Sequence, residues 1–424
     1  MPADTRLWHA FADMHAVRGS EFVIARGDGA HVWDEEGTQY LDGTASLWCV
    51  NVGHGRDEIV EAAMAQMRVL ASYQTFGVFA NRPALDLAER LADLAPLDDP
   101  RIFLGSGGGD AIDTAAKLAR RYWQAVGEPQ RVHLISRIHG YHGTHGYGTS
   151  LAGIEANRAG FGVFDPATSS VPHDDVAALA AAFERVGPEN IAAFFCEPVI
   201  GAGGVFPPAP GYIEACAALC EEAGVLFVAD CVICGFGRLG SWWGVERFGL
   251  EPDMITFAKG VTSGYLPLGG VAVSGRVAEP FWEGDGAPIF RHGATYSAHA
   301  TCCAAGLANL DILEREGLIP RGEELEGDLL SALAPLATDP SVSEVRGGTG
   351  LLAAVGIRQE VLSARPDAPF LVAAGARDAG VLVRAQGAGV AVSPPLTIQP
   401  EHLSQMAEGI AAGLARLTEV AGAV

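Results

Sequence analysis

The sequence predicts an α/β fold: a mostly parallel central sheet with helices on both faces, and a separate small α+β domain. Between about residues 100 and 275, short apolar runs alternate with stretches of helical spacing, the pattern of a parallel sheet built by right-handed crossovers. Several of these runs are too short for a helix, and short apolar runs are typical of buried strands. Each of them is followed by a charged residue. From about Arg321 the pattern changes to short strands between helices.

This change of pattern divides the chain into three parts. Residues 1–55 form an N-terminal segment that belongs to the small domain, residues 56–320 form the large domain, and residues 321–424 form the C-terminal small domain. The sequence contains no internal repeat, low-complexity tract or linker rich in Pro and Ser, so we expect the domains to pack closely.

The composition excludes two classes of partner. The chain of 424 residues carries a formal net charge of −23, whereas binding to nucleic acid or to an anionic membrane needs a basic face. The N-terminal stretch MPADTRLWHAF lacks the basic and apolar regions of a signal peptide, and no apolar run approaches membrane-spanning length. We therefore expect a cytoplasmic protein.

The first hundred residues predict short elements followed by two longer helices. A helix and a turn are expected over residues 1 to about 24, and then two short strands around a turn at Glu36-Gly37. Helical spacing of apolar residues covers Arg56–Ala71 and Arg82–Leu94. Trp48 lies in a glycine-bounded loop, where it is either a packed aromatic residue or a wall of a substrate pocket.

A glycine-rich loop joins the next predicted strand and helix. The strand is Arg101–Leu104, and the helix is expected to start near Asp110. Backbone amides at a helix N-terminus attract anions, so Gly107, Gly108 and Gly109 are candidate phosphate binders. The stretch GSGGGD matches neither the Walker motif nor a dinucleotide-binding fingerprint.

A loop rich in histidine and glycine follows a strand at HLISR. His139, His142 and His145 recur every third residue, a spacing that invites a metal-site interpretation. The many glycines and the lack of a nearby Cys or acidic residue argue against it. Tyr141 is better suited to stacking on a flat ring.

Three charged residues end three apolar runs. Glu197 follows IAAFFC, Asp230 follows VLFVA and Lys259 follows MITFA, and ligands bind at the carboxyl ends of parallel strands. A lysine can form a Schiff base with an aldehyde and an aspartate can keep a pyridine nitrogen protonated, the minimum for pyridoxal phosphate catalysis. The alternatives are a structural ion pair for Asp230 and Lys259, and hydrogen bonds to loop amides or an arginine for Glu197.

The cysteines favour a structural role. Cys231 and Cys234 form a CxxC pair, but there is no second pair at zinc spacing and no helix opens behind it, which argues against a metal or redox site. Several of the eight cysteines lie within apolar runs, as expected of reduced thiols in a core.

The remaining elements complete both domains. GGVAVS predicts one more strand after Lys259, and Thr295 lies on a loop before a long helix of small residues. The C-terminal part predicts an amphipathic helix over Arg321–Ala337, several short strands and a last helix from Glu401.

Eight stretches, in the same order, resemble the class III aminotransferases, fold type I pyridoxal phosphate enzymes that include the ω-transaminases of the amine:pyruvate type. The stretches span nearly the whole chain and are GTASLWCVNVGHG, GGGDAIDTAAKLARRYW, GYHGTHG, CEPV, VADCVICGFGRLG, PDMITFAKG, HGATYSAHATCCAA and VRAQGAGVAVSPPLTI. Eight ordered matches are far more specific than any one of them. The resemblance implies the fold type I architecture and pyridoxal 5'-phosphate as the cofactor.

The resemblance also implies roles around the cofactor. Lys259 would form the internal aldimine and then move the proton of the transfer reaction, while Asp230 would pair with the pyridine nitrogen. Tyr141 would stack on one face of the ring and Val232 would press on the other. Glu197, in the matching CEPV stretch, belongs with these cofactor-binding residues.

Further roles concern the phosphate, the substrate and a second subunit. Gly108 and Gly109 would bind the phosphate through backbone amides, and Thr295 would bind it from a neighbouring subunit, so the resemblance implies a homodimer with shared active sites. Pairing of dimers into a tetramer stays open. Trp48 matches a substrate-pocket aromatic residue, and Arg384 matches a mobile arginine that binds the carboxylate of the keto acid.

The chain departs from the usual family pattern at several positions. Cys231 replaces the glutamate of DEV, and Gly109 replaces the serine of GSE. Ala298 and Ala300 replace the glycine and the proline of SGHP, and Ala385 follows Arg384 where proline is common.

The function implied is transamination, in which an amino group moves from an amine or ω-amino acid to a keto acid such as pyruvate. Aminomutase, racemase and decarboxylase activities use the same lysine and aspartate and are the alternatives within the fold. A non-catalytic binding protein is the alternative outside it. The sequence does not specify the amine donor or its chirality.

Overall fold

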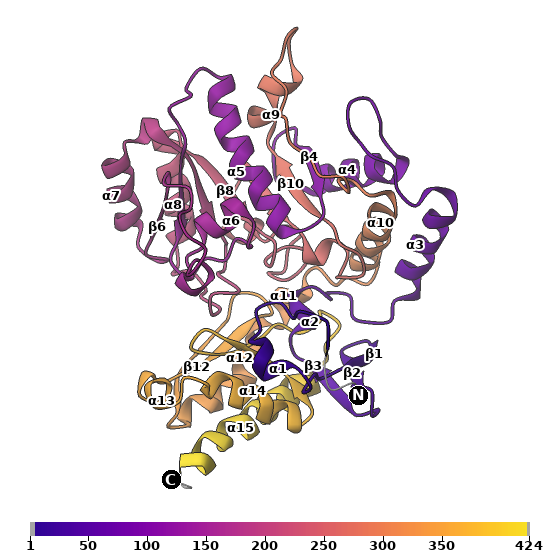
Figure 1. Cartoon of the computed structure of the whole chain (residues 1–424), viewed down its shortest axis with the longest axis vertical. Coiled ribbons are helices and arrows are strands. Elements are labelled where there is room, and N and C mark those ends of the chain that lie inside the picture. The colour runs from indigo at the N-terminus through magenta and orange to yellow at the C-terminus, as the bar shows by residue number, and fades with distance from the viewer. Residues whose placement is uncertain (1–4, 422–424) are drawn as a thin grey trace.

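A seven-stranded sheet forms the centre of the larger part of the molecule (Figure 1). The computed structural model describes the backbone of residues 5–421 and the side chains of residues 5–417. The strand order is β4-β10-β9-β8-β7-β5-β6. The strands are β4 (Arg101–Gly105), β5 (His133–Arg137), β6 (Thr168–Val171), β7 (Ile191–Cys196), β8 (Leu226–Asp230), β9 (Met254–Phe257) and β10 (Gly269–Val273).

The direction of β10 is the exception to the parallel sheet predicted over residues 100–275. The five neighbouring strands from β6 to β9 are parallel, whereas β10 is antiparallel to both β9 and β4. Between β9 and β10 the chain forms only a short 3₁₀ turn, Lys259–Val261, and a parallel crossover needs a longer connection. The prediction of a mostly parallel sheet is confirmed.

Helices cover both faces of this sheet, as predicted. On one face, α5 (Gly108–Ala125) packs on inward-pointing residues such as Phe195 and Val228. On the other face, α7 (Val176–Val186) and α8 (Tyr212–Ala223) pack on Phe194 and Phe227. Successive strand residues therefore belong to two different apolar cores, because side chains alternate between the faces of a strand.

The remaining helices of the large part lie around the sheet in Figure 1. They are α3 (Asp57–Leu70), α4 (Arg82–Leu94), α6 (Gly146–Leu151), α9 (Gly275–Trp282) and α10 (Ala300–Arg315). The two helices predicted before residue 95 are confirmed as α3 and α4. The long α10 contacts both of them.

Two four-stranded sheets form the smaller part of the molecule. One has the order β1-β2-β3-β13 and the other β11-β12-β15-β14. Their strands are β1 (Ile24–Asp28), β2 (His31–Asp34), β3 (Gln39–Asp42), β11 (Val342–Arg346), β12 (Ala353–Ile357), β13 (Val381–Leu382), β14 (Arg384–Gln386) and β15 (Gly389–Val392). The accompanying helices are α11 (Arg321–Glu324), α12 (Glu326–Leu333), α13 (Gln359–Ala364), α14 (Ala368–Asp378) and α15 (Pro400–Ala421).

The parallel pairing of β3 with β13 joins the two ends of the chain in one sheet. We accordingly keep the division into residues 1–55, 56–320 and 321–424 as a proposal in which the first and last parts make one small domain. Among residues 5–421, no helix combines the length and the apolar character needed to cross a membrane.

The N-terminal expectations were partly wrong. The helix predicted over residues 1 to about 24 is only a single turn, α1 (Met14–Val17), and residues 1–4 lie outside the described part. The strands around Glu36-Gly37 are confirmed as β2 and β3. The loop around Trp48 contains a short kinked helix, α2 (Ala45–Trp48).

Candidate active site

A cavity of about 210 Å³ lies where the parallel strands end. It is lined by Gly108, Gly109, Ile112, Tyr141, His142, Gly143, Glu197, Asp230, Val232, Ile233 and Lys259. Seven of these are site residues that the sequence predicted: Gly108, Gly109, Tyr141, Glu197, Asp230, Val232 and Lys259. They meet because the carboxyl ends of parallel strands share one edge of the sheet.

Asp230, the last residue of β8, is held in place by three hydrogen bonds. Its Oδ2 lies 2.7 Å from Nδ1 of His142, and its Oδ1 accepts from Thr256 Oγ1 at 3.1 Å and from the Val232 amide at 3.2 Å. The side chains of Asp230 and His142 are both buried. The carboxylate is therefore fixed in orientation and still lines the cavity.

His142 and Thr256 bond the carboxylate of Asp230, and the sequence did not predict either as a site residue. From sequence, His142 is a candidate only for the metal-site interpretation of the histidine loop, and Thr256 belongs to the apolar run MITF. Neither reveals its role locally, because each contacts Asp230 across a sequence separation of 88 or 26 residues. A histidine next to the predicted stacking residue Tyr141 was the only available signal.

Lys259 stands in the 3₁₀ turn after β9 in a left-handed conformation, with φ at 46°. Such a backbone is uncommon for a residue with a side chain and marks positions that the surroundings determine strongly. Burial of its amine lowers the pKa of Lys259, while the charge of Asp230 acts in the opposite direction. A lowered pKa enlarges the neutral, nucleophilic fraction of the amine.

The N-terminus of α5 forms another wall. Gly108 and Gly109 are its first two residues, whose amides have no carbonyl partner in a preceding turn. A Cβ on Gly108 would lie 2.9 Å from Cγ1 of Val232, so glycine allows this close approach. Oδ2 of Asp110 accepts from the Ser106 amide at 3.0 Å. The helix predicted to start near Asp110 thus begins two residues earlier.

Glu197 fixes the loop that carries Tyr141. Its Oε1 accepts from the Tyr141 amide at 2.9 Å and its Oε2 from the Gly201 amide at 3.0 Å. Burial raises the pKa of Glu197, and His142 opposes this effect. The bonds to loop amides are the structural alternative expected for Glu197, and they also place Tyr141 at the cavity.

Three predicted site residues lie outside this lining. Trp48 is 3% exposed in the apolar core, with φ at 64°. Thr295 is exposed on the segment between α9 and α10. Arg384 is the first residue of β14. Desolvation lowers the pKa of its guanidinium, and the charge of Tyr141 acts in the opposite direction. The side chains of Arg384 and Tyr141 are therefore close enough to interact electrostatically.

The histidines of the HGYHGTHG loop have separate partners. His142 contacts Asp230, His145 lies 3.4 Å from Oδ1 of Asp110, and His139 stacks on Phe206 with ring centroids 4.8 Å apart. Their side chains thus do not converge on one ion.

The thiols of the CxxC pair are buried in the apolar core. Cys231 and Cys234 are fully buried, and burial raises the pKa of both thiols. Cys231 replaces the usual glutamate at a position where a carboxylate would need a buried partner.

Comparison with known proteins decides the family. Residues 14–414 match the family model described as aminotransferase class-III. The chain belongs to the class III aminotransferases. This aminotransferase is 36% identical to the putrescine–pyruvate aminotransferase of Pseudomonas aeruginosa over 436 aligned residues, which cover 95% of each chain.

Solved structures agree with this family over almost the whole chain. An amine transaminase from an uncultivated Pseudomonas species in its PLP-bound form has a TM-score of 0.92 and 37% identity, covering 98% of this chain and 99% of that one. An (S)-enantioselective ω-transaminase from Thermomicrobium roseum has a TM-score of 0.92 and 40% identity, covering 96% of each chain. The aminotransferase therefore has the fold type I architecture, transfers amino groups between small amines and keto acids, and uses pyridoxal 5'-phosphate.

The cavity fits that cofactor in its set of chemical groups. Amides at the N-terminus of α5 suit a phosphate, the amine of Lys259 suits an aldehyde, and the carboxylate of Asp230 suits a protonated ring nitrogen. Tyr141 and Val232 add an aromatic and an aliphatic wall.

Proposed function

We propose that this class III aminotransferase is an ω-transaminase that moves an amino group from an amine or ω-amino acid to a keto acid such as pyruvate, in two half-reactions. The observation that carries the proposal is the single cavity lined by Lys259, Asp230 and the first amides of α5. Similarity to a putrescine–pyruvate aminotransferase supports the choice of donor class and acceptor.

The residues of α5 would bind the cofactor phosphate. The amides of Gly108 and Gly109 point from a helix N-terminus, where the helix dipole favours an anion. Backbone donors can serve here although Gly109 lacks the hydroxyl of the usual serine.

Lys259 would hold the cofactor aldehyde through Nζ and then act as base and acid. Its lowered pKa, caused mainly by burial, leaves Nζ available to take the proton from the carbon that bears the donor's amino group. Bound pyridoxal phosphate supplies the electron sink that makes this proton removable.

Asp230 would accept a hydrogen bond from the protonated ring nitrogen. Its carboxylate keeps one fixed orientation through His142 and Thr256, so no reorganisation is needed when charge develops. Tyr141 and Val232 would hold the ring flat between them, and Glu197 would keep the Tyr141 loop in position.

Arg384 would bind the carboxylate of the keto acid. Among the described residues its side chain has no hydrogen bond or ion pair, so its planar guanidinium is available for two parallel bonds to a carboxylate. Trp48, fixed in the core, would limit the size of the amine substituent.

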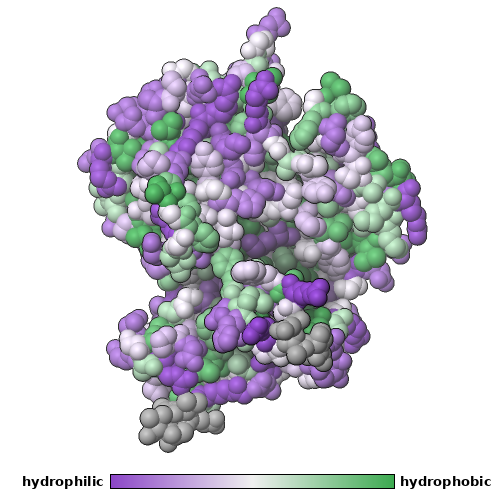
Figure 2. Space-filling view, viewed as in Figure 1, coloured by the Kyte–Doolittle hydropathy of each residue, from purple (hydrophilic) through white to green (hydrophobic). Residues whose placement is uncertain are grey.

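A second copy of the chain would complete the site through Thr295. Apolar side chains are exposed along α3 and the segment after it: Met67, Val69, Leu70, Tyr73, Phe76, Val78 and Phe79. Figure 2 shows hydrophobic surface gathered along the right-hand edge, where Figure 1 draws this part of the chain. A buried hydrogen bond from Asn81 Nδ2 to the Ala298 carbonyl, at 2.9 Å, ties the chain just after this segment to the segment that carries Thr295.

These features support a homodimer with shared active sites, because an apolar patch of this kind is typical of an interface.

All eight cysteines are free thiols, which is consistent with a reducing compartment such as the cytoplasm.

The test is an assay of the purified protein with pyridoxal phosphate, an amine and pyruvate. Transamination predicts one alanine formed for each amine consumed, and none with Lys259→Ala. An isomerase, racemase or decarboxylase of this fold would convert its substrate without alanine formation, and that result would replace the proposal.

A further inference from the structure

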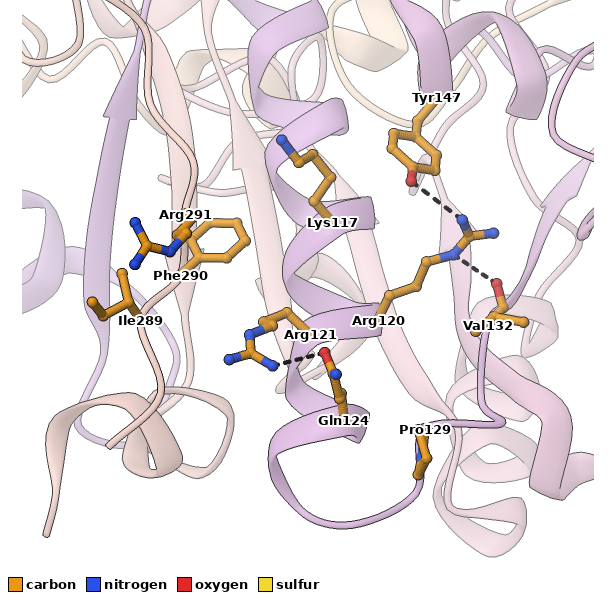
Figure 3. A pocket seen from close by; sticks show the side chains of 10 residues that line it. All are labelled: Lys117, Arg120, Arg121, Gln124, Pro129, Val132, Tyr147, Ile289, Phe290 and Arg291. Atoms are coloured by element: carbon orange, nitrogen blue, oxygen red, sulfur yellow. Dashed lines mark hydrogen bonds between the residues drawn. The ribbon is translucent and has the colours of Figure 1, made fainter. Parts of the chain in front are cut away.

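A second cavity, of about 660 Å³, lies along the C-terminal half of α5. Figure 3 shows that one wall is the helix itself, with Lys117, Arg120 and Arg121, and that the opposite wall is the segment carrying Phe290 and Arg291. None of its lining residues lines the cofactor cavity. From Gly109 to Arg121 the helix rises about 18 Å, so the two cavities are well separated along α5.

Four cations line this cavity, and only one of them is neutralised by an ion pair. Arg120 pairs with Asp165 at 2.6 Å and also bonds the Val132 carbonyl and the Tyr147 hydroxyl. Within residues 5–417, no carboxylate lies at ion-pair distance from Lys117, Arg121 or Arg291. The cavity therefore concentrates the positive charge of three cations that have no ion-pair partner among the described residues, on a chain whose net charge is −23.

The weak existing contacts leave these cations able to bind a ligand. In the described part of the chain, the Arg121 guanidinium bonds only the amide oxygen of Gln124, at 2.7 Å, and Lys117 bonds Nδ1 of His292 at 2.9 Å. Burial lowers the pKa of His292, which favours its neutral form, and an imidazole carries no negative charge that could offset that of Lys117. The last turn of α5 contains no basic residue, so compensation of the helix dipole does not account for the cluster.

We propose that this cavity binds a compact dianion, with two carboxylates or one phosphate as its charged groups. Two guanidinium forks and one ammonium match such groups in charge and in hydrogen-bond geometry. Phe290 and Tyr147 provide flat walls for the rest of the molecule.

The experiment titrates the holoenzyme with inorganic phosphate or with succinate, and follows the unfolding temperature and the heat of binding. Sodium chloride at equal ionic strength is the control for screening. Binding should raise the unfolding temperature beyond the effect of sodium chloride, and the stronger of the two anions identifies the ligand class.

Two variants locate the binding. Arg121→Gln and Arg291→Gln should each raise the dissociation constant at least about tenfold, because each removes a charge-assisted contact without leaving a buried carboxylate unpaired. Arg185→Gln on α7, an exposed arginine in another part of the surface, is the matched change of charge and should leave binding intact.

An effect no larger than that of sodium chloride overturns the proposal, as does binding that survives in the Arg121→Gln/Arg291→Gln double variant. Binding that disappears only in Arg384→Ala would assign the anion to the active site and also contradict the proposal. Alanine formation is measured in the same variants, so failure of the transaminase function is seen separately.

Discussion

The inner and outer parts of the active site are held by different kinds of contact. Asp230 is bonded by Thr256 of the adjacent strand β9 and by His142 of the loop after β5, and Glu197 fixes that same loop through the Tyr141 amide. Thr295 lies on a surface loop and Arg384 on a strand of another sheet, and neither side chain has such a bond to any residue that the structure describes. Rigid inner groups suit cofactor chemistry that is shared by all substrates, and we propose that the outer groups serve the substrate and the partner subunit.

The largest effect is expected for Asp230→Asn. An amide cannot keep the ring nitrogen protonated, so kcat should fall roughly 10²- to 10³-fold for every donor, the usual loss for one preorganised electrostatic group. Steady-state kinetics with several amines will check this. A loss of kcat that varies strongly from donor to donor would mean that Asp230 contacts the substrate rather than serving the cofactor in every reaction.

A graded control uses the partners of Asp230. Thr256→Val should cost less than about tenfold in kcat, because Oδ1 of Asp230 keeps its bond from the Val232 amide. His142→Gln should cost more, because it removes the shorter bond to the carboxylate, 2.7 Å against 3.1 Å. Equal losses in the two variants would contradict the ranking.

Arg384→Ala should separate the two half-reactions. We expect KM for the keto acid to rise about ten- to a hundredfold, the value of a charged bidentate contact, with the amine half-reaction unchanged. Single-turnover measurements of each half-reaction will show this. An equal loss in both half-reactions would contradict this role, because Arg384 would then act on the chemistry that the two half-reactions share.

Asp42 is expected to control the segment that carries Trp48. Ala45, Ser46 and Trp48 all have positive φ, and Asp42 accepts bonds from the Ser46 amide at 2.7 Å and from His54 Nε2 at 2.8 Å. Asp42→Asn should destabilise the fold by about 1–3 kcal/mol, as loss of a buried charged partner does, and alter the preference among amine donors. Unfolding temperatures and donor profiles are the measurements.

The pH dependence of this contribution follows from the pKa of Asp42. Burial would raise that pKa, but hydrogen bonds from His54 and the Ser46 amide outweigh it and hold the pKa below its usual value. The stabilisation is therefore complete above about pH 4, the unfolded value, and is lost as the pH falls through the folded pKa. Asp42→Asn should flatten the acid side of the stability profile, and an unchanged profile would contradict this role.

The smallest effect concerns Ala298, which has φ at 56° where the family usually has glycine. Ala298→Gly relieves a left-handed strain of about 1–2 kcal/mol but adds the entropic cost of glycine, so the gain should be about 0.5 kcal/mol. Thermal unfolding will measure it. A decrease in stability would mean that the alanine methyl group contributes to packing.

The sequence predicted the inner site better than the outer one, for a physical reason. Asp230, Lys259 and Glu197 each end an apolar run, and parallel strands bring their ends together without further information. The role of His142 depends on a contact 88 residues away, which no local pattern encodes. The antiparallel direction of β10 follows from the connection between β9 and β10, which is too short for a parallel crossover.

The surroundings of Trp48 and Arg384 could not be predicted because they depend on how distant parts pack. Trp48 follows β3, which pairs with β13 from the C-terminal part, and Arg384 lies just beyond β13. The resemblance to the family supplied roles for both residues, but their burial and charge environment required the structure.

The most direct measurement is borohydride reduction of the holoenzyme followed by peptide mass mapping. Reduction fixes the cofactor on the amine that holds it, and the chain contains only two lysines, Lys117 and Lys259. We predict the pyridoxyl mass on Lys259 alone, and its absence when an amine donor is added before the borohydride. Labelling of Lys117 instead, or amine-to-pyruvate transfer by Lys259→Ala, would contradict the account.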